Sequence, residues 1–284
     1  MAMNIYETYP IKESLLPFHF HLENLRPKLD YPNWHDDIEF LYCINEGGTV
    51  RCNGRQYEFK NNDVICINPG ELHSSSTSGK FIYYCLIINS NFCKENGIDT
   101  GKLWFETYIS DRKISKKFQN VVDAYANLHS FKNSEKNDLQ LNIAKSTIRL
   151  AVLDLLVSLT TTHLISEKNS ESQHEPTTNY AKQILEYISA NISKNFTLDE
   201  IADYIGISKY HLAREFKYIT GHTIIEQINI LKCNEAKKLI ESGKSVTEAA
   251  TLLGFNDLPY FSQVFKKYMR VSPSKSRILT VERI

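Results

Sequence analysis

Two stretches near the carboxyl end of the chain, 48 positions apart, carry side chains that suit hydrogen bonding to the edges of DNA bases. In each stretch these residues follow a polar cap, at the expected start of a helix, and that end of a helix meets base edges first in a major groove. The first stretch supplies Ser208, Lys209, Tyr210, His211, Ala213, Arg214 and Lys217, and the second supplies Leu258, Pro259, Ser262, Gln263, Lys266 and Lys267. Arg214 is the best candidate for a bidentate contact with guanine.

The same signals for the start and end of helices surround both stretches. In the first, Thr197 and Glu200 form a capping-box pattern, Gly206 suits a left-handed turn, and Ser208 caps the next helix. In the second, Asp257 takes the capping position. The apolar positions predict the cores of the two units: Leu198, Ile201, Ala202, Ile205, Leu212, Phe216 and Ile219, then Leu253, Phe255, Phe261, Val264 and Phe265. Two helix-turn-helix units joined by one helix over 224–240 predict a module that reads two successive major-groove faces.

The distribution of charge supports this interpretation. The whole chain has 33 basic and 33 acidic residues, a net charge of zero that argues weakly against a nucleic-acid binder. Residues 1–175 contain 18 basic and 22 acidic residues, whereas residues 176–284 contain 15 basic and 11 acidic ones. The basic excess therefore lies with the repeated helices, as contact with phosphates requires.

Packed helices with solvated charges would explain one such unit, but two copies at this spacing make that explanation weak. Residues 196–277 resemble the DNA-binding domain of the AraC/XylS transcription regulators, above all in Tyr-Phe-Ser-Gln-Val-Phe-Lys-Lys-Tyr at 260–268 and Val-Ser-Pro-Ser at 271–274. The resemblance implies two recognition helices in adjacent major grooves, with base contacts from Tyr210, Ala213, Arg214, Leu258, Pro259, Ser262 and Gln263. Arg270 stands where that family usually has glycine.

Short β-rich runs with turn signals between them occupy residues 18–90 and predict a small barrel or sandwich. Asn53-Gly54 is the strongest hairpin signal among them. From about residue 101 the apolar period becomes helical, and residues 165–178, almost without apolar side chains, predict a linker. The expected fold class is α+β: a cupin-like barrel with helices over 1–164, then an all-α domain with two helix-turn-helix motifs over 179–284.

The segments 34–39 and 69–73 resemble the two halves of a cupin barrel motif. The resemblance implies ligand sensing, and the candidates to line a pocket for a sugar-like molecule are His21, Trp34, His35, Glu39, Arg51 and His73. Each also has a structural interpretation, such as an ion pair for Glu39 or a core position for Trp34. Metal-binding cupins carry a second histidine where this chain has Asp37, so we expect neither a metal nor another cofactor.

The expected helices over 114–163 have two open interpretations: they pack against the barrel within one chain, or they join two copies of it. Both interpretations can hold together. In a dimer, ligand binding would be coupled to the spacing of the two DNA-binding domains.

These features predict a ligand-responsive regulator that binds specific DNA sequences, and family habit favours activation of carbohydrate-use genes. The expected partners are double-stranded DNA, a small-molecule effector, a second copy of the chain and RNA polymerase. The alternative is a metal-dependent cupin enzyme fused to a DNA-binding domain, which Asp37 disfavours. An architectural DNA binder is a third hypothesis, disfavoured by the large barrel.

The cysteine spacing and the distribution of apolar residues also suggest where in the cell the protein is found. Six cysteines without Cys-x-x-Cys spacing indicate buried free thiols in a reducing cytosol. The amino terminus shows no signal-peptide pattern. The most apolar expected helix, over 139–159, is interrupted by Asn142, Lys145, Arg149 and Asp154, which excludes a membrane span. We therefore expect a cytoplasmic protein without membrane contact.

Overall fold

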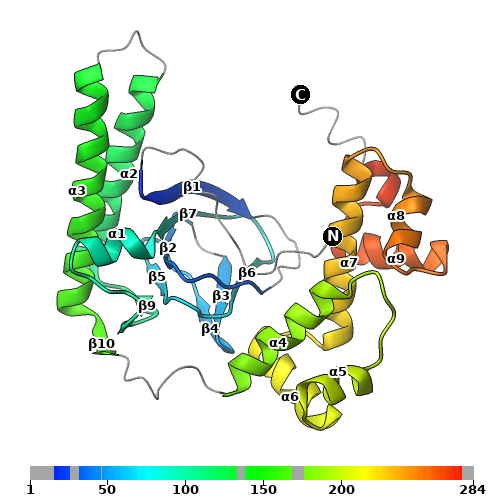
Figure 1. The fold of residues 1–284 in the computed structure, drawn as a ribbon. Coiled ribbons are helices and arrows are strands. Elements are labelled where there is room, and N and C mark those ends of the chain that lie inside the picture. The colour runs from blue at the N-terminus through cyan, green and yellow to red at the C-terminus, as the bar shows by residue number, and fades with distance from the viewer. Residues whose placement is uncertain (1–15, 26–31, 46, 133–137, 168–175, 277–284) are drawn as a thin grey trace.

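The computed structural model describes residues 16–25, 32–45, 47–132, 138–167 and 176–276. The fold class is α+β, as predicted, with the strands in the first half and a helical domain at the carboxyl end (Figure 1). The amino-terminal segment discussed above and residues 168–175 of the predicted linker lie outside the described residues.

Two antiparallel sheets face each other in the first half of the chain, an arrangement called the barrel below. The larger sheet contains, in order, β1 (Phe18–Leu25), β7 (Phe81–Ile88), β2 (Ile38–Cys43), β5 (Val64–Ile67) and β9 (Tyr108–Ile109). The smaller contains β4 (Arg55–Glu58), β3 (Gly48–Cys52) and β6 (His73–Thr77). The predicted hairpin is confirmed, because Asn53 and Gly54 turn between β3 and β4 with φ of 45° and 86°.

The central strands of the larger sheet are buried on both faces. One face, which includes Leu41, Ile65 and Cys85, packs toward the smaller sheet and fills the barrel interior. The opposite face, which includes Phe40 and Leu86, packs against two long helices, α2 (Arg112–Lys132) and α3 (Asp138–Thr162). Because successive residues of a strand point to opposite faces, β2 and β5 are buried at every position rather than at alternate ones, and Glu39 is the one charged residue among them.

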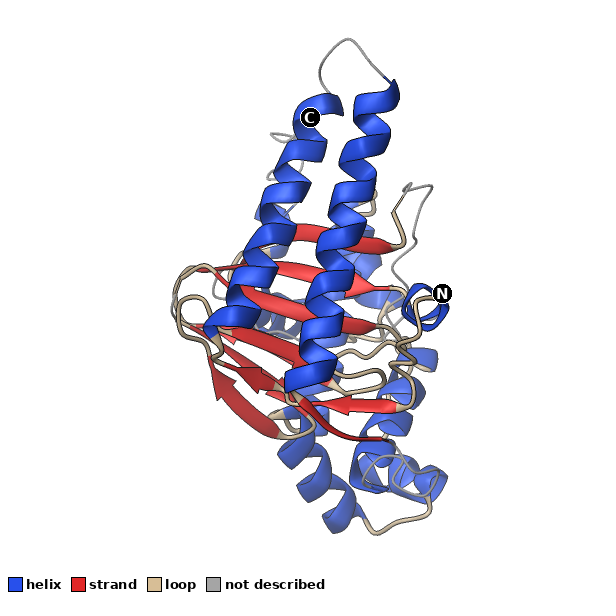
Figure 2. Ribbon diagram, turned by 90° about the vertical axis from the view of Figure 1, so that its left-hand side faces the viewer, coloured by secondary structure: helices blue, strands red, loops and turns tan. Residues whose placement is uncertain are grey.

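The helices α2 and α3 form a hairpin that lies across the strands and extends past them (Figure 2). The helical region begins at Arg112 and not near residue 101, because β8 (Leu103–Phe105) and β9 come first, after the short α1 (Ser90–Glu95). β8 pairs with β10 (Leu164–Glu167), which occupies the first residues of the predicted linker. Strands of two to four residues give too few positions for a period of two to be recognised.

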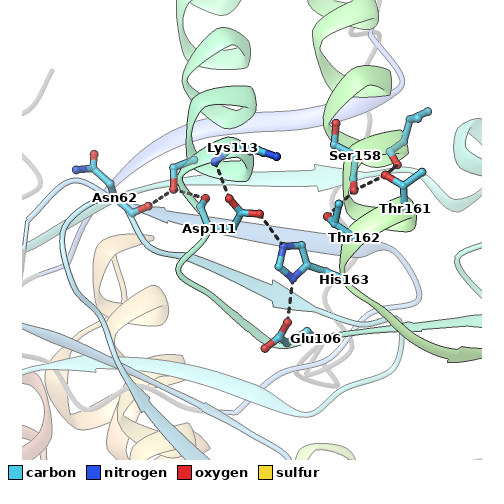
Figure 3. A network of polar contacts seen from close by, with 10 residues as sticks. Asn62, Glu106, Asp111, Lys113, Ser158, Thr161, Thr162 and His163 are labelled. Carbon is cyan, nitrogen blue, oxygen red and sulfur yellow. Dashed lines mark hydrogen bonds and ion pairs between the residues drawn. The ribbon is translucent and has the colours of Figure 1, made fainter.

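His163 ties the end of α3 to the barrel (Figure 3). Its Nδ1 lies 2.9 Å from a carboxylate oxygen of Glu106, and its Nε2 lies 3.3 Å from one of Asp111. The Asp111 carboxylate also accepts from the backbone N–H of Lys113, in the first turn of α2, and this contact lowers the pKa of Asp111. One imidazole thus joins the two helices at the end that faces the barrel.

The carboxyl-terminal domain is helical throughout its described elements. These are α4 (Pro176–Ala190), α5 (Leu198–Ile205), α6 (Lys209–Thr220), α7 (Ile224–Glu241), α8 (Val246–Leu252) and α9 (Leu258–Met269). The predicted caps are confirmed at Thr197, Gly206, Ser208 and Asp257. Further capping boxes open α7 at Thr223 and α8. Local signals therefore fix where most of these helices begin.

The predicted helical cores are buried as expected, apart from Leu198, Ile205 and Phe255, which are half-buried at the edge of the cluster. Each of the six cysteines is buried. Within the described ranges, no helix combines the length and the apolar character needed to cross a membrane.

Arg270 ends α9 in the left-handed region, with φ of 61°, where a side chain strains the backbone. We expect Arg270→Gly to be more stable than Arg270→Ala by about 1 kcal/mol, because both lose the charge and only glycine relieves the strain. Urea unfolding of the two variants measures the difference. Gly206→Ala is the converse control, since φ is 80° there and a Cβ would meet no atom within 4 Å. Equal stability of Arg270→Gly and Arg270→Ala would contradict the expectation.

Candidate DNA interface and ligand site

The first recognition helix, α6, presents its polar residues on the face away from the core. Ser208 Oγ accepts from the backbone N–H of His211 at 3.4 Å and fixes the start of the helix. Leu212 and Phe216 anchor the opposite face in the domain core. Tyr210 is 81% exposed, and the Arg214 side chain is 74% exposed. The predicted base-reading residues of α6 therefore share one accessible surface.

Two cations of this surface have acidic partners within the chain. Arg214 donates to Glu215 at 2.9 Å, and Lys209 Nζ lies 3.0 Å from Asp199. Exposed ion pairs of this kind contribute little to stability. DNA can therefore replace these partners at low cost.

The second recognition helix, α9, has a sparser polar face. Asp257 accepts from the backbone N–H of Tyr260, and Pro259 occupies the first turn. Leu258, Pro259, Gln263, Lys266 and Lys267 are exposed, and Ser262 is half-buried. Tyr260, which is 51% exposed, was missing from the predicted set. Tyr260 directly precedes the core residue Phe261, so the sequence pattern at this position is that of a core residue.

Three of the predicted ligand-site residues meet inside the barrel. The Nε2 atoms of His35 and His73 lie 2.8 and 3.1 Å from the same Glu39 oxygen, Oε2. Cys85, in β7, donates its thiol to the other oxygen, Oε1, at 3.1 Å. The side chain of Asp37 lies elsewhere, because its Oδ1 accepts from the backbone N–H of Ser90 at the start of α1.

The charge of this cluster follows from its contacts. Burial raises the pKa of Glu39, but the charges and hydrogen bonds of His73 and His35 outweigh burial and hold that pKa well below the usual range. His19, which the sequence reasoning missed, lies near enough for Glu39 to affect it. Burial lowers the pKa of His19, the charge of His21 lowers it further, and Glu39 opposes both.

The other three predicted ligand-site residues lie apart from this cluster or at its edge. Trp34 is 5% exposed and belongs to the core of the helical domain, the structural interpretation given above. Arg51 donates to the carbonyl of Gly54 at 3.0 Å and to Gln56 at 2.9 Å. His21, in β1, has an Nδ1 that is buried and has no hydrogen-bond partner among the described residues.

The barrel contacts the helical domain through the same segments that carry the histidines. Lys182, in α4, donates to the Gly70 carbonyl, and its Nζ lies 5.6 Å from the centre of the Trp34 ring. Leu72 joins Trp34 in the helical core. A second contact involves the β3–β4 hairpin, where a Cβ on Gly54 would come within 2.9 Å of the Tyr218 ring in α6. Trp34 and Leu72, which contact the helical domain, are therefore the sequence neighbours of His35 and His73.

Family models match both halves of the chain. Residues 27–144 match the model of the AraC-like ligand binding domain, and residues 201–277 match that of a helix-turn-helix domain. The multiple antibiotic resistance protein MarA of Escherichia coli is 34% identical over 100 residues, which cover 35% of this chain and 79% of MarA. The chain belongs to the AraC family of transcription regulators.

One sequence relative spans both halves of the chain. The uncharacterized HTH-type transcriptional regulator YbfI of Bacillus subtilis is 25% identical over 245 residues, 84% of this chain and 85% of YbfI. Among solved structures, ToxT of Vibrio cholerae covers 93% of this chain and 98% of its own, with 14% identity and a TM-score of 0.43. The chain is thus a DNA-binding regulator with a ligand-binding domain, and YbfI, which spans both domains, is a transcriptional regulator.

We expect Arg214→Ala in this AraC-family protein to relax base preference at one position of the DNA site, at a cost of about 1–3 kcal/mol. The physical reason is the loss of a bidentate donor to guanine. Arg214→Lys is the matched control, because it keeps the charge without the planar fork and should relax the same position. Binding-site selection measures the preference. An unchanged preference in both variants would contradict the assigned role.

Proposed function

We propose that the chain activates carbohydrate-use genes in response to a sugar-like molecule, by reading two adjacent major grooves with α6 and α9. The observation that carries the DNA-reading part is the exposed polar face of each recognition helix, held by a confirmed cap at Ser208 and Asp257. The residues proposed for DNA contact are exposed or half-buried, as such contact requires. As an activator, the protein would also contact RNA polymerase.

The support for a polar effector is the chemistry of the barrel interior. His21 offers a buried ring nitrogen that no described residue satisfies, and such a group gains free energy from a ligand hydroxyl. Glu39 and the neighbouring His19 add charge and hydrogen-bonding capacity on the same side of the sheet. A sugar combines many hydroxyl groups with apolar C–H faces, which suits a mainly apolar barrel with a few polar groups.

A thermal-shift screen of mono- and oligosaccharides tests the effector. A true ligand at one hundred times its Kd should stabilise the protein by about 2.7 kcal/mol and raise its melting temperature, because it binds only the folded state. His21→Ala should remove this shift, whereas the exposed His129→Ala should keep it. If no sugar raises the melting temperature, the sugar class is wrong and DNA binding is unaffected.

The proposed homodimer uses the outward face of α3. Apolar side chains on that face are exposed in the single chain: Leu139 is 66% exposed, Ile143 56%, Leu150 66% and Val157 51%. Ile143, Leu150 and Val157 are seven residues apart, the spacing of a seam between two packed helices. The inner face of α3, which includes Ile148 and Val152, is already buried against α2 and the sheet. Both interpretations of these helices can therefore hold at once.

We expect Leu150→Asp to weaken self-association by about tenfold or more, because a buried leucine contributes roughly 1.5–3 kcal/mol and 1.4 kcal/mol is a factor of ten. Sedimentation equilibrium of the full chain measures the change. Asn142→Asp is the control, since it adds the same charge to an exposed position outside the stripe. A monomeric wild-type protein, or equal effects of the two substitutions, would rule out this interface.

A further inference from the structure

A pocket of about 340 Å³ lies in the helical domain, and every residue that lines it belongs to that domain. Its walls come from three segments: residues 194–196 after α4, one face of α7, and residues 254–257 in the turn before α9. Residues 194–196 directly precede the cap of α5, and α7 joins the two helix-turn-helix units (Figure 1). The pocket therefore touches both units, and its volume suits a small ligand.

The ammonium group of Lys232, in α7, lies at the wall of this pocket. Lys232 is 4% exposed. Its Nζ donates to the carbonyl oxygen of Lys194 at 3.2 Å and to Oδ1 of Asn195 at 3.3 Å, and it lies 5.5 Å from the centre of the Phe255 ring. A Cβ on Gly254 would lie 3.4 Å from the same nitrogen. Because all four of these neighbours line the pocket, the ammonium group borders it as well.

No carboxylate among the described residues compensates this charge. An ammonium group has three N–H donors, and the two hydrogen bonds of Lys232 reach neutral oxygen atoms. Burial lowers the pKa of Lys232, and no neighbouring charge opposes this effect. Buried charges are ordinarily paired, because removing an ion from water without a partner is costly. Lys232 therefore has a donor and a positive charge for a partner that enters the pocket.

The charge of the lining suits an anion. Two lysines and one aspartate line the pocket, which gives a net charge of +1. The aspartate, Asp257, is already engaged, because its Oδ1 accepts from the backbone N–H of Tyr260 and caps α9. The second lysine, Lys194, is exposed and donates to Oδ1 of Asn191. Lys232 is therefore the buried cation that an anion would meet.

We propose that this pocket binds a small organic carboxylate, whose charge pairs with Lys232 and whose apolar body packs against Ile228 and Phe255. Both apolar side chains line the pocket, and the amide of Asn229, which lines it too, is a second donor for carboxylate oxygens. A single negative charge matches the net charge of the lining, whereas a phosphate monoester carries about −1.5 to −2 at neutral pH. This ligand class differs from the uncharged, sugar-like molecule proposed for the barrel.

A carboxylate in this pocket would change DNA affinity by fixing the two helix-turn-helix units relative to each other, a step that rests on the proposed function. The two segments already approach closely, since a Cβ on Gly254 would come within 2.7 Å of the carbonyl oxygen of Ser193. Two recognition helices fit two adjacent major grooves only at a suitable spacing. A ligand that prefers one spacing therefore shifts DNA affinity, and DNA shifts the affinity for that ligand by the same factor.

Titration of the full chain with benzoate, followed by NMR without DNA and at constant ionic strength, tests the pocket. Benzoate should bind saturably and neutral benzamide should not, because only benzoate can pair with the ammonium group. Lys232→Met should weaken benzoate binding by at least about tenfold, since it removes a hydrogen bond to a charged group. Asn256→Asp should also weaken it, because this exposed lining residue keeps its shape and gains a like charge. Asn142→Asp, in α3, and His21→Ala, in the barrel, should bind benzoate as the wild type does.

Three results would overturn the proposal: no saturable benzoate binding, equal binding by the wild type and Asn256→Asp, or binding lost in His21→Ala and kept in Lys232→Met. The last result would place the anion in the barrel. Because Lys232→Met also removes two hydrogen bonds to residues 194–195, circular dichroism checks its fold, and Asn256→Asp decides the test if that variant unfolds. Sequence-specific DNA binding by the wild type without benzoate tests the regulator assignment separately. Unchanged DNA affinity at saturating benzoate would contradict the coupling between the two units.

Discussion

The contact of the Glu39 carboxylate with two imidazoles is the interaction on which both halves of the molecule depend. It joins the segment of His35 to that of His73 inside the barrel. On their other side the same segments carry Trp34 and Leu72, which belong to the core of the helical domain. A buried and fully hydrogen-bonded carboxylate has few alternative positions, so it fixes the two segments relative to each other. The surface that meets α4 is thus set by chemistry within the barrel.

This arrangement gives a ligand a short route to the DNA-reading helices. A ligand shifts the regulator between states only when it binds one state more tightly than the other. The contact of Lys182 with the Gly70 carbonyl and the Trp34 ring lies directly behind the polar cluster. The β3–β4 hairpin adds a second contact, at the carboxyl end of α6, where Arg51 packs against Gly221. Both segments therefore contact the helical domain, and the hairpin contacts the first recognition helix itself.

The helical domain could be predicted in detail, because its elements are specified by local signals. Thr197, Ser208 and Asp257 cap their helices through side chains that lie within three residues of the N–H they satisfy. The barrel was predicted in outline, since period and turn residues indicate strands but not the short pairing of β8 with β10. The positions of the candidate ligand-site residues were predicted only in part. His35, Glu39 and His73 meet as the motif implied, but Trp34 faces the other domain, and no local pattern distinguishes a pocket aromatic from one at a domain boundary.

The basic excess of the helical domain is modest, and this gives a reason for two copies of the chain to associate through the exposed apolar side chains of α3. Affinity for DNA grows with the number of phosphates that cations neutralise. Arg214 and Lys209 are paired with acids in the free protein, so part of the positive charge must first exchange partners. The second helix, with Leu258 and Pro259 at its start, offers few hydrogen-bond donors to bases. Two linked copies would combine the affinities of their DNA-binding domains. The exposed Ile143–Leu150–Val157 seam is the part of the structure that would supply that link.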